Sequence, residues 1–186
     1  MKQVNFGRKQ KGFSMIQLGV VIAITLILAA LGMPKFKDYL VQGRIPTIGQ
    51  DLQRYIANVV TSAGGASTTP YTGLDQASFA RDMRGTSLMT ETGNSTVRHN
   101  LGGGTAGTVV VTQTGDSFVL TLNSVSAAAC PELATTMQRS VDDISINGTQ
   151  VKVTATDKTI TTPFAAPSAK THCTDGDTNT YVFTIR

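Results

Sequence analysis

A long uncharged segment near the N-terminus constrains this chain more than any other feature. No residue from Phe13 to Met33 carries an ionisable side chain. As a helix, this run spans roughly 31 Å, close to the hydrocarbon thickness of a bilayer. The preceding residues include three lysines and an arginine but no acid. Since positive charge keeps a short flanking segment in the cytoplasm, the rest of the chain is predicted to lie outside.

Two common kinds of N-terminal segment compete as explanations of this run. A secretory signal peptide has an apolar core of about 7–15 residues, followed by a small-x-small cleavage site. The run here is longer and ends in Leu-Gly-Met-Pro-Lys, without such a site. A plain signal anchor fits the length equally well, so the distinction depends on the residues at the start of the run.

Those residues carry a family resemblance. Gly12 is followed by Phe-Ser-Met-Ile-Gln-Leu. This resembles the cleavage motif of type IV prepilins, a Gly followed by Phe-Thr-Leu-Ile-Glu-Leu. The resemblance implies that a prepilin peptidase removes residues 1–12 as a leader, cutting after Gly12 on the cytoplasmic side. Phe13 would then be the N-methylated first residue, and the apolar helix would stay on the mature protein.

Two further positions become candidate assembly residues through this resemblance. Pro34 is the twenty-second residue counted from Phe13, where many pilins carry a proline. Proline lacks an amide donor and crowds a carbonyl of the preceding turn, so we expect the helix to kink or open there. Gln17 is the fifth residue, where pilins usually have a Glu that meets the charged N-terminus of a neighbouring subunit. Gln17 can accept a hydrogen bond from that amine but cannot neutralise it, and some tip-initiating pilins also lack the Glu.

The net charge gives no support for nucleic-acid binding. The chain has 16 basic and 12 acidic residues, but four of the basic residues precede Phe13 and every acidic residue follows it. The mature chain is therefore formally neutral, with 12 residues of each sign. Since nucleic-acid-binding domains carry a basic surface, we do not expect nucleic acid to be a partner.

Beyond the proline, an amphipathic helix is predicted to continue. Apolar residues recur at steps of three and four, the period of a helix with one buried face. Gly43 and Pro46 disturb the pattern, so we expect one long, interrupted helix over 13–62. Its first part, 13–33, is the anchor, and its second part packs on a globular head over 63–186. The stripe consists of Ile45, Ile48, Leu52, Tyr55, Ile56 and Val59.

The head is predicted to contain an antiparallel sheet, so the fold class is α+β. One hairpin joins 108–112 to 118–122, and a second joins 144–146 to 151–153 around Asn147-Gly148, a strong hairpin signal. Short helices are expected over 74–84 and 131–141, and 181–185 is the last strand. The tail, with its closing Tyr-Val-Phe-Thr-Ile-Arg, resembles the C-terminal region of type IVb pilins.

The two cysteines, Cys130 and Cys173, follow the anchor and are predicted to lie outside the cytoplasm, where disulfides persist. The alternatives are one bridge or two buried free thiols, and an exported chain with two cysteines favours the bridge. It would bound the C-terminal region of the head.

Catalysis has few candidate residues. His99 and His172 are far apart in sequence, and a bridged Cys173 cannot be a nucleophile. The glycine run 102–104 lacks the strand–loop–helix context and the lysine of a phosphate-binding loop. We therefore expect no enzymatic activity and no cofactor.

One cluster has the composition of a cation site. Asp175, Asp177 and Asn179 alternate along the chain, as oxygen ligands of Ca²⁺ do. The twelfth position of an EF-hand loop would need a Glu, however, and here it is Arg186. The alternative is a loop of Asx turns. We expect no metal, with these three residues as the candidates for calcium.

Together these features predict a subunit of a type IV pilus that polymerises through its N-terminal helix. It would reside in the inner membrane as a precursor and then in an extracellular filament. The resemblance implies as partners other copies of the chain, the prepilin peptidase, an assembly ATPase and a platform protein. The alternatives are a pseudopilin of a type II secretion system, a minor tip pilin, or a membrane-anchored adhesin.

Overall fold

The computed structural model describes residues 14–64, 68–91 and 95–186, so Gly12 and Phe13 lie outside the described part. Contacts divide the chain into two units, one ending at Lys37 and one from Asp38 to Arg186. The long helix α1 (Met15–Ala63) contributes residues to both. The second half of the helix thus belongs to the same compact unit as the head.

The interruption of α1 expected near Gly43 and Pro46 is absent, because the helix is continuous from Met15 to Ala63. Gly43 and Pro46 are exposed, while Ile45 and Ile48 on the opposite face are fully buried. The backbone carbonyl that loses its partner at Pro46 therefore lies on the solvent side, and apolar packing on the other side holds the helix together. Helical backbone also continues through Pro34, so the helix does not open there.

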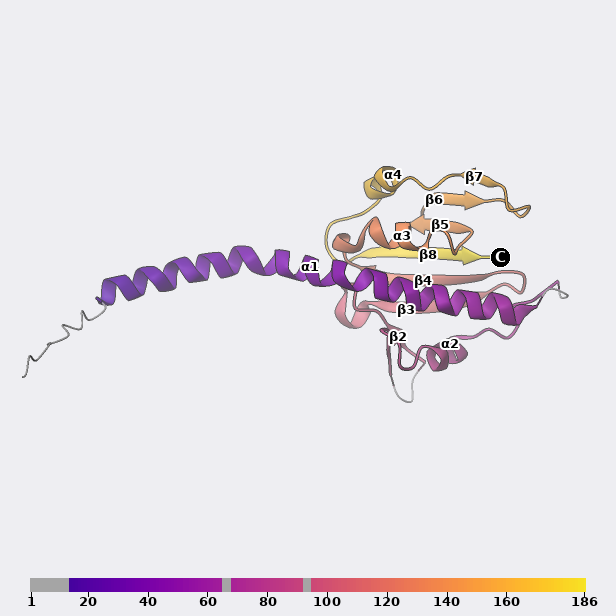
Figure 1. Ribbon diagram of the computed structural model, residues 1–186, viewed down its shortest axis with the longest axis horizontal. Helices are drawn as coiled ribbons and strands as arrows, with labels where there is room; N and C mark the ends of the chain where they lie inside the picture. The colour runs from indigo at the N-terminus through magenta and orange to yellow at the C-terminus, as the bar shows by residue number, and fades with distance from the viewer. Residues whose placement is uncertain (1–13, 65–67, 92–94) are drawn as a thin grey trace, which may run out of the picture. The chain divides into compact units, whose positions relative to one another are not determined.

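The unit from Asp38 to Arg186 contains an eight-stranded sheet in which every neighbouring pair is antiparallel (Figure 1). The strand order is β1-β2-β3-β4-β8-β5-β6-β7. This confirms the α+β prediction of a long helix on an antiparallel sheet. The strands are β1 (Met89–Thr90), β2 (Val97–Arg98), β3 (Thr108–Gln113), β4 (Phe118–Val125), β5 (Asp143–Ile146), β6 (Thr149–Thr154), β7 (Ile160–Thr162) and β8 (Asn179–Ile185).

Short helices flank the sheet. They are α2 (Gln76–Asp82), α3 (Glu132–Met137) and α4 (Ala166–Thr171), with 3₁₀ turns η1 (Gly104–Ala106) and η2 (Ala127–Ala129). Asp75 starts α2 with a capping box, accepting a hydrogen bond from the Ser78 amide at 2.7 Å. The helix predicted over 131–141 ends earlier, at Met137.

The predicted Asn147-Gly148 hairpin is confirmed. Ile146 pairs with Thr149, so the loop between β5 and β6 has two residues. Asn147 and Gly148 both have positive φ, 51° and 83°, as a type I′ turn requires.

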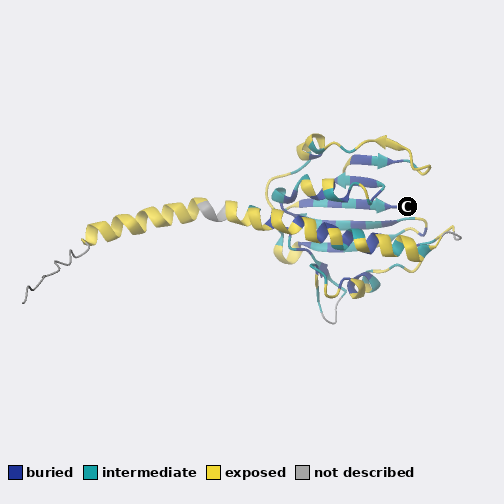
Figure 2. Cartoon of the chain, in the orientation of Figure 1, coloured by how far each residue is buried: buried dark blue, intermediate teal, exposed yellow. Residues whose placement is uncertain are grey.

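The core lies between the second half of α1 and the sheet. Alternate residues of β4 and β8 are fully or almost fully buried, and so is the stripe of α1 from Ile45 to Ile56, whereas Val59 is only partly buried (Figure 2). Tyr55 of α1 meets Phe118 of β4 edge-to-face at 6.4 Å. The strand residues are Phe118, Leu120 and Leu122 of β4 and Tyr181, Phe183 and Ile185 of β8.

Gly49 of α1 lies against Thr136 of α3. A Cβ atom at this position would lie 2.5 Å from Cγ2 of Thr136, inside any real carbon–carbon contact. One turn further along, the Gln53 amide donates a 2.7 Å hydrogen bond to the carbonyl of Thr136. The lack of a side chain at position 49 therefore leaves the space that the Thr136 methyl group occupies.

Gly49→Ala is predicted to destabilise the folded protein by about 1–3 kcal/mol through overpacking. In an open helical site the same change stabilises by roughly 0.5–1 kcal/mol, so the sign of the effect is diagnostic. Thr136→Ser removes Cγ2 but retains the hydroxyl that bonds the Glu132 carbonyl at 3.0 Å, so it should restore stability to the double variant. Chemical denaturation of the detergent-solubilised protein measures both effects.

The matched control is Gly43→Ala in the same helix, where a Cβ would meet nothing within 4 Å. It should be neutral or stabilising. Equal destabilisation by both alanines would contradict the packing argument.

Candidate functional site

The N-terminal part of α1 presents apolar side chains that no described residue covers. Met15, Ile16 and Leu31 are 91%, 79% and 70% exposed. By length and composition, the helix is sufficient to cross a membrane. Water is a poor environment for such a surface, so this part of the chain requires either lipid or other protein around it.

Gln17 closes the first turn of its own helix. Its side-chain oxygen accepts a 3.3 Å hydrogen bond from the amide of Ser14, and the Leu18 amide donates to the Ser14 carbonyl at 3.2 Å. The first contact is half of a capping box, the arrangement that satisfies otherwise orphaned amides at a helix start. Gln17, which the sequence predicts to be an assembly residue, thus bonds a residue of its own chain in the described part. At Pro34 only the helical backbone is described, and the cleavage site Gly12-Phe13 lies outside the described residues.

The predicted disulfide between Cys130 and Cys173 is confirmed, with Cα atoms 6.3 Å apart. It joins the start of α3 to the end of α4, 43 residues later in the chain. Closing a loop of this length stabilises a fold by roughly 3–4 kcal/mol on chain-entropy grounds.

Two asparagines, the buried Asn179 and the exposed Asn147, fix the loop that follows Cys173. The Asn179 side-chain oxygen accepts hydrogen bonds from the amide and hydroxyl of Thr174 and from the Asn147 amide, at 2.7, 3.1 and 2.9 Å. The Asn179 amide group donates to the carbonyls of Val125 and Thr174. Asn179 is fully buried, so every one of these bonds replaces a contact with water.

This geometry bears on the three calcium candidates. The oxygen of Asn179 is engaged by protein donors, while Asp175 is exposed. Asp177 lies beside the loop at Gly102, where a Cβ would come within 2.9 Å of its carboxylate. Within the described residues, no group of three or more His, Cys, Asp or Glu side chains is placed to hold a metal ion.

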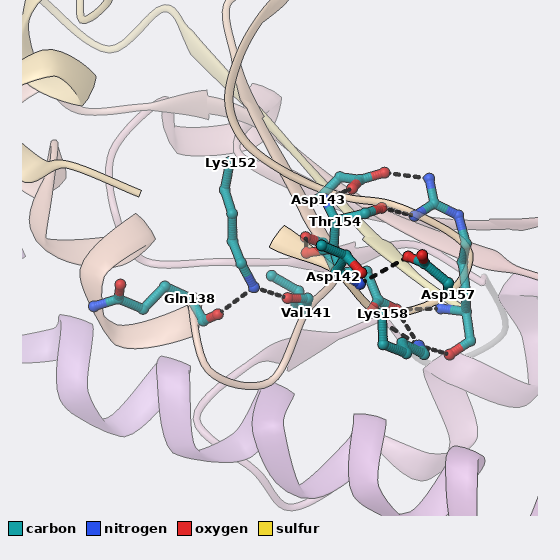
Figure 3. Close-up of polar contacts among 10 residues, drawn as sticks. Gln138, Val141, Asp142, Asp143, Lys152, Thr154, Asp157 and Lys158 are labelled. Carbon is teal, nitrogen blue, oxygen red and sulfur yellow. Dashed lines mark hydrogen bonds and ion pairs between the residues drawn. The ribbon is translucent and has the colours of Figure 1, made fainter. Parts of the chain in front are cut away.

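A lysine that the sequence analysis did not identify ends α3. Lys152 of β6 is almost fully buried, and its ammonium group donates to the carbonyl of Gln138 at 2.7 Å and to that of Val141 (Figure 3). Positive charge at the carboxyl end of a helix satisfies carbonyls that have no further turn to bond. Burial lowers the pKa of Lys152. The only sequence signal was a single lysine in an otherwise apolar and hydroxyl-rich strand.

Polar and charged groups also bind Arg186, the residue that follows β8; its partners Asp142, Asp143, Thr154 and Lys158 are labelled in Figure 3. The Arg186 guanidinium bonds the Asp143 carboxylate and, at 2.9 Å, the Thr154 carbonyl. Its backbone amide donates to Asp142 at 2.7 Å, and Lys158 bridges Asp142 and the Arg186 carbonyl. The contacts connect β5, β6 and the residue that follows β8.

The glycine run and His99 form one packed unit. A Cβ at Gly103 would lie 2.4 Å from the Ser124 carbonyl oxygen, so the run allows close approach of two backbones. The ring of His99 is buried, donating from Nε2 to the Asn123 carbonyl at 2.7 Å and accepting at Nδ1 from the Leu101 amide at 3.2 Å. A second proton on the ring would place one donor against another. Burial also disfavours the charged ring, and it lowers the pKa of His99.

His99 is predicted to make the head less stable in mild acid. Because its pKa is lower in the folded chain, the unfolded chain binds the proton more readily below the ordinary value of about 6.5. The contribution of the neutral His99 ring to the free energy of unfolding is therefore fully present above about pH 6.5. It decreases as the pH falls from there towards the lowered pKa, because the unfolded chain takes up the proton first. Melting temperatures between pH 7.5 and 5 measure the slope (roughly the titration range of histidine).

His99→Gln should flatten that slope, whatever it does to the absolute melting temperature. His172→Gln is the matched control and should retain the wild-type slope. An unchanged slope in His99→Gln would show that other groups cause the pH dependence.

A comparison with known protein families gives one further finding. Residues 51–186 match the sequence model of the family described as PilS N terminal. The matched range begins in the second half of α1 and includes every strand of the sheet and both cysteines.

Proposed function

The chain belongs to the PilS N-terminal family, which is related to pilins, and on this basis we propose that it is a structural subunit of a type IV pilus. Family membership makes it a pilus-associated protein. The more specific role rests on the exposed, uncharged N-terminal part of α1 together with a compact head.

The observation that carries the proposal is the exposure of apolar side chains along the first turns of α1. A helix without charge can leave a bilayer and pack against copies of itself without exposing an ionised group to an apolar environment. In such a filament the helices form the core and the heads form the surface. Extraction from the membrane needs work, which an assembly ATPase and a platform protein would supply.

The other parts of the proposal follow from the same mechanism. The precursor would sit in the inner membrane, a prepilin peptidase would cut after Gly12, and the mature protein would join an extracellular filament of its own copies. The chain would act by packing and not as an enzyme, and its neutral mature charge does not favour nucleic acid as a partner.

Processing is the first prediction of this proposal. Wild-type protein should begin at Phe13, with a mass increment of one methyl group, and Gly12→Ala should retain the leader and fail to assemble. N-terminal mass spectrometry and electron microscopy of sheared filaments measure the two effects. An intact leader on wild-type protein, or cleavage after the apolar run, would overturn the pilin proposal in favour of an anchor or a signal peptide.

Gln17 supplies the second prediction, because its oxygen caps the Ser14 amide. Gln17→Glu keeps an acceptor at this position and should leave filament yield unchanged or higher. Gln17→Ala and the isosteric Gln17→Met both remove the acceptor and should lower yield to a similar degree. Filament mass per cell, relative to total subunit, is the measurement.

The same series separates the major-subunit proposal from the tip-subunit alternative. A tip subunit would be present in trace amounts, and all three changes would leave filament yield unaffected. That result would refute the role of this chain as the main component of the filament.

A further inference from the structure

The turn between β5 and β6 contains the only Asn-Gly pair in the sequence, Asn147-Gly148. Both residues are exposed, and a Cβ atom at Gly148 would meet nothing within 4 Å. Asparagine followed by glycine is especially susceptible to deamidation, because glycine has no side chain to hinder attack of its nitrogen on the asparagine carboxamide. By sequence and exposure, the turn is therefore a candidate for this modification.

The carboxamide of Asn147 is nevertheless held by three hydrogen bonds. Its Nδ2 donates to the His172 carbonyl at 2.8 Å and to Oδ1 of Asn179 at 2.9 Å. Its Oδ1 accepts a 2.9 Å bond from the Thr180 amide. All three partners belong to the segment 172–180, which leads from the disulfide into β8. Both hydrogens of Nδ2 are thus used, and the side chain is directed towards this segment.

Deamidation requires a different orientation of the carboxamide. The Gly148 nitrogen must attack Cγ of Asn147, so that a C–N bond forms and Nδ2 leaves as ammonia with the proton of the Gly148 amide. Water then opens the resulting succinimide at either carbonyl, giving aspartate or isoaspartate. The net reaction consumes one water and releases one ammonia, without an oxidant or a reductant. Rotation of the carboxamide to meet the Gly148 nitrogen breaks its bonds to 172–180, so these bonds block the first step.

The product of the reaction cannot restore these contacts. An ionised carboxylate has no proton to donate, and the two groups that face Nδ2, the His172 carbonyl and Oδ1 of Asn179, are themselves acceptors. Isoaspartate would also add a backbone carbon to the turn, which disrupts the two-residue geometry between Ile146 and Thr149. Deamidation thus makes an opening of the segment 172–180 irreversible.

We propose that Asn147 is a deamidation site controlled by the segment 172–180. The carboxamide is retained while the segment holds it. Water hydrolyses it once the segment opens, and the carboxylate then prevents the segment from closing again. The modification therefore accumulates in heads whose C-terminal region has opened. The site does not depend on filament assembly, because every group in it lies in the unit from Asp38 to Arg186.

Peptide mapping of the full mature chain, incubated in detergent at mildly alkaline pH, tests the site. The tryptic peptide 140–152 contains Asn147, and conversion of the amide to the acid raises its mass. In the folded wild type, Asn147 should deamidate at least about tenfold more slowly than in the same chain reduced and unfolded in guanidinium chloride. Equal rates in the two states would overturn the proposal.

Asp175→Asn supplies a matched control on the same head, because it creates a second Asn-Gly pair with Gly176. The side chain of Asp175 is exposed and makes no hydrogen bond or ion pair in the described part of the chain. The new pair should therefore deamidate at close to the unfolded rate while Asn147 in the same molecule stays intact. Equal protection of both pairs would show that the bonds to 172–180 are not the cause.

Two further variants test the control and its irreversibility. Asn179→Ala removes one partner of Asn147 and should accelerate deamidation about tenfold, and an unchanged rate in the folded variant would refute control by the segment. Where Asn179→Ala does not fold, the two pairs of Asp175→Asn decide the question. Asn147→Asp reproduces the product and should lower the melting temperature by about 2–10 °C, whereas Asp175→Asn should leave it unchanged. A wild-type melting temperature in Asn147→Asp would show that the folded head tolerates the product, and would refute the one-way step.

Discussion

Burial of one face of α1 against β4 and β8 is the interaction on which the head depends. An isolated amphipathic helix interrupted by a glycine and a proline would be marginal in water. Here each fully buried side chain of the stripe, such as Ile45 or Leu52, contributes about 1.5–3 kcal/mol through its removal from water. This packing keeps the backbone helical through Pro46 and determines which side of the helix faces solvent.

The sheet can offer that face only because its last strand lies in its middle. β8 pairs with β4 on one side and β5 on the other, although long segments of chain separate it from both. Such non-local pairing carries a large loop-closure cost, and the C-terminal region contains several devices that offset it. The disulfide shortens the loop between Cys130 and Cys173, and Asn179 ties the start of β8 to Val125 of β4. At the other end of β8, Arg186 bonds Asp143 of β5.

Sequence reasoning found the elements whose signals are local and missed those created by tertiary contact. The helical stripe, the Asn147-Gly148 hairpin and the disulfide follow from periodicity, turn chemistry and the predicted compartment, and the structure contains all three. The two-residue strands β1 and β2 are too short to leave a periodic pattern. Lys152 ends α3 from a strand that follows it in the chain, and no spacing rule connects the two. The contact between Tyr55 of α1 and Phe79 of α2, with ring centroids 4.8 Å apart, likewise appears only once the two helices are packed.

The cap at Gln17 gives a physical reason for an amide where pilins usually have a carboxylate. Within a bilayer, an ionised side chain is costly unless it is paired, whereas an amide can satisfy the Ser14 backbone without carrying charge. An unassembled subunit with Gln17 would therefore reside in the membrane at a lower free-energy cost than one with Glu. It would also gain less on assembly, since a neutral hydrogen bond to a neighbour's amine is weaker than a charge-assisted one. In the proposed filament, the neutral contact at position 17 therefore supplies little of the assembly free energy. Most of that free energy must come from packing of the apolar helices.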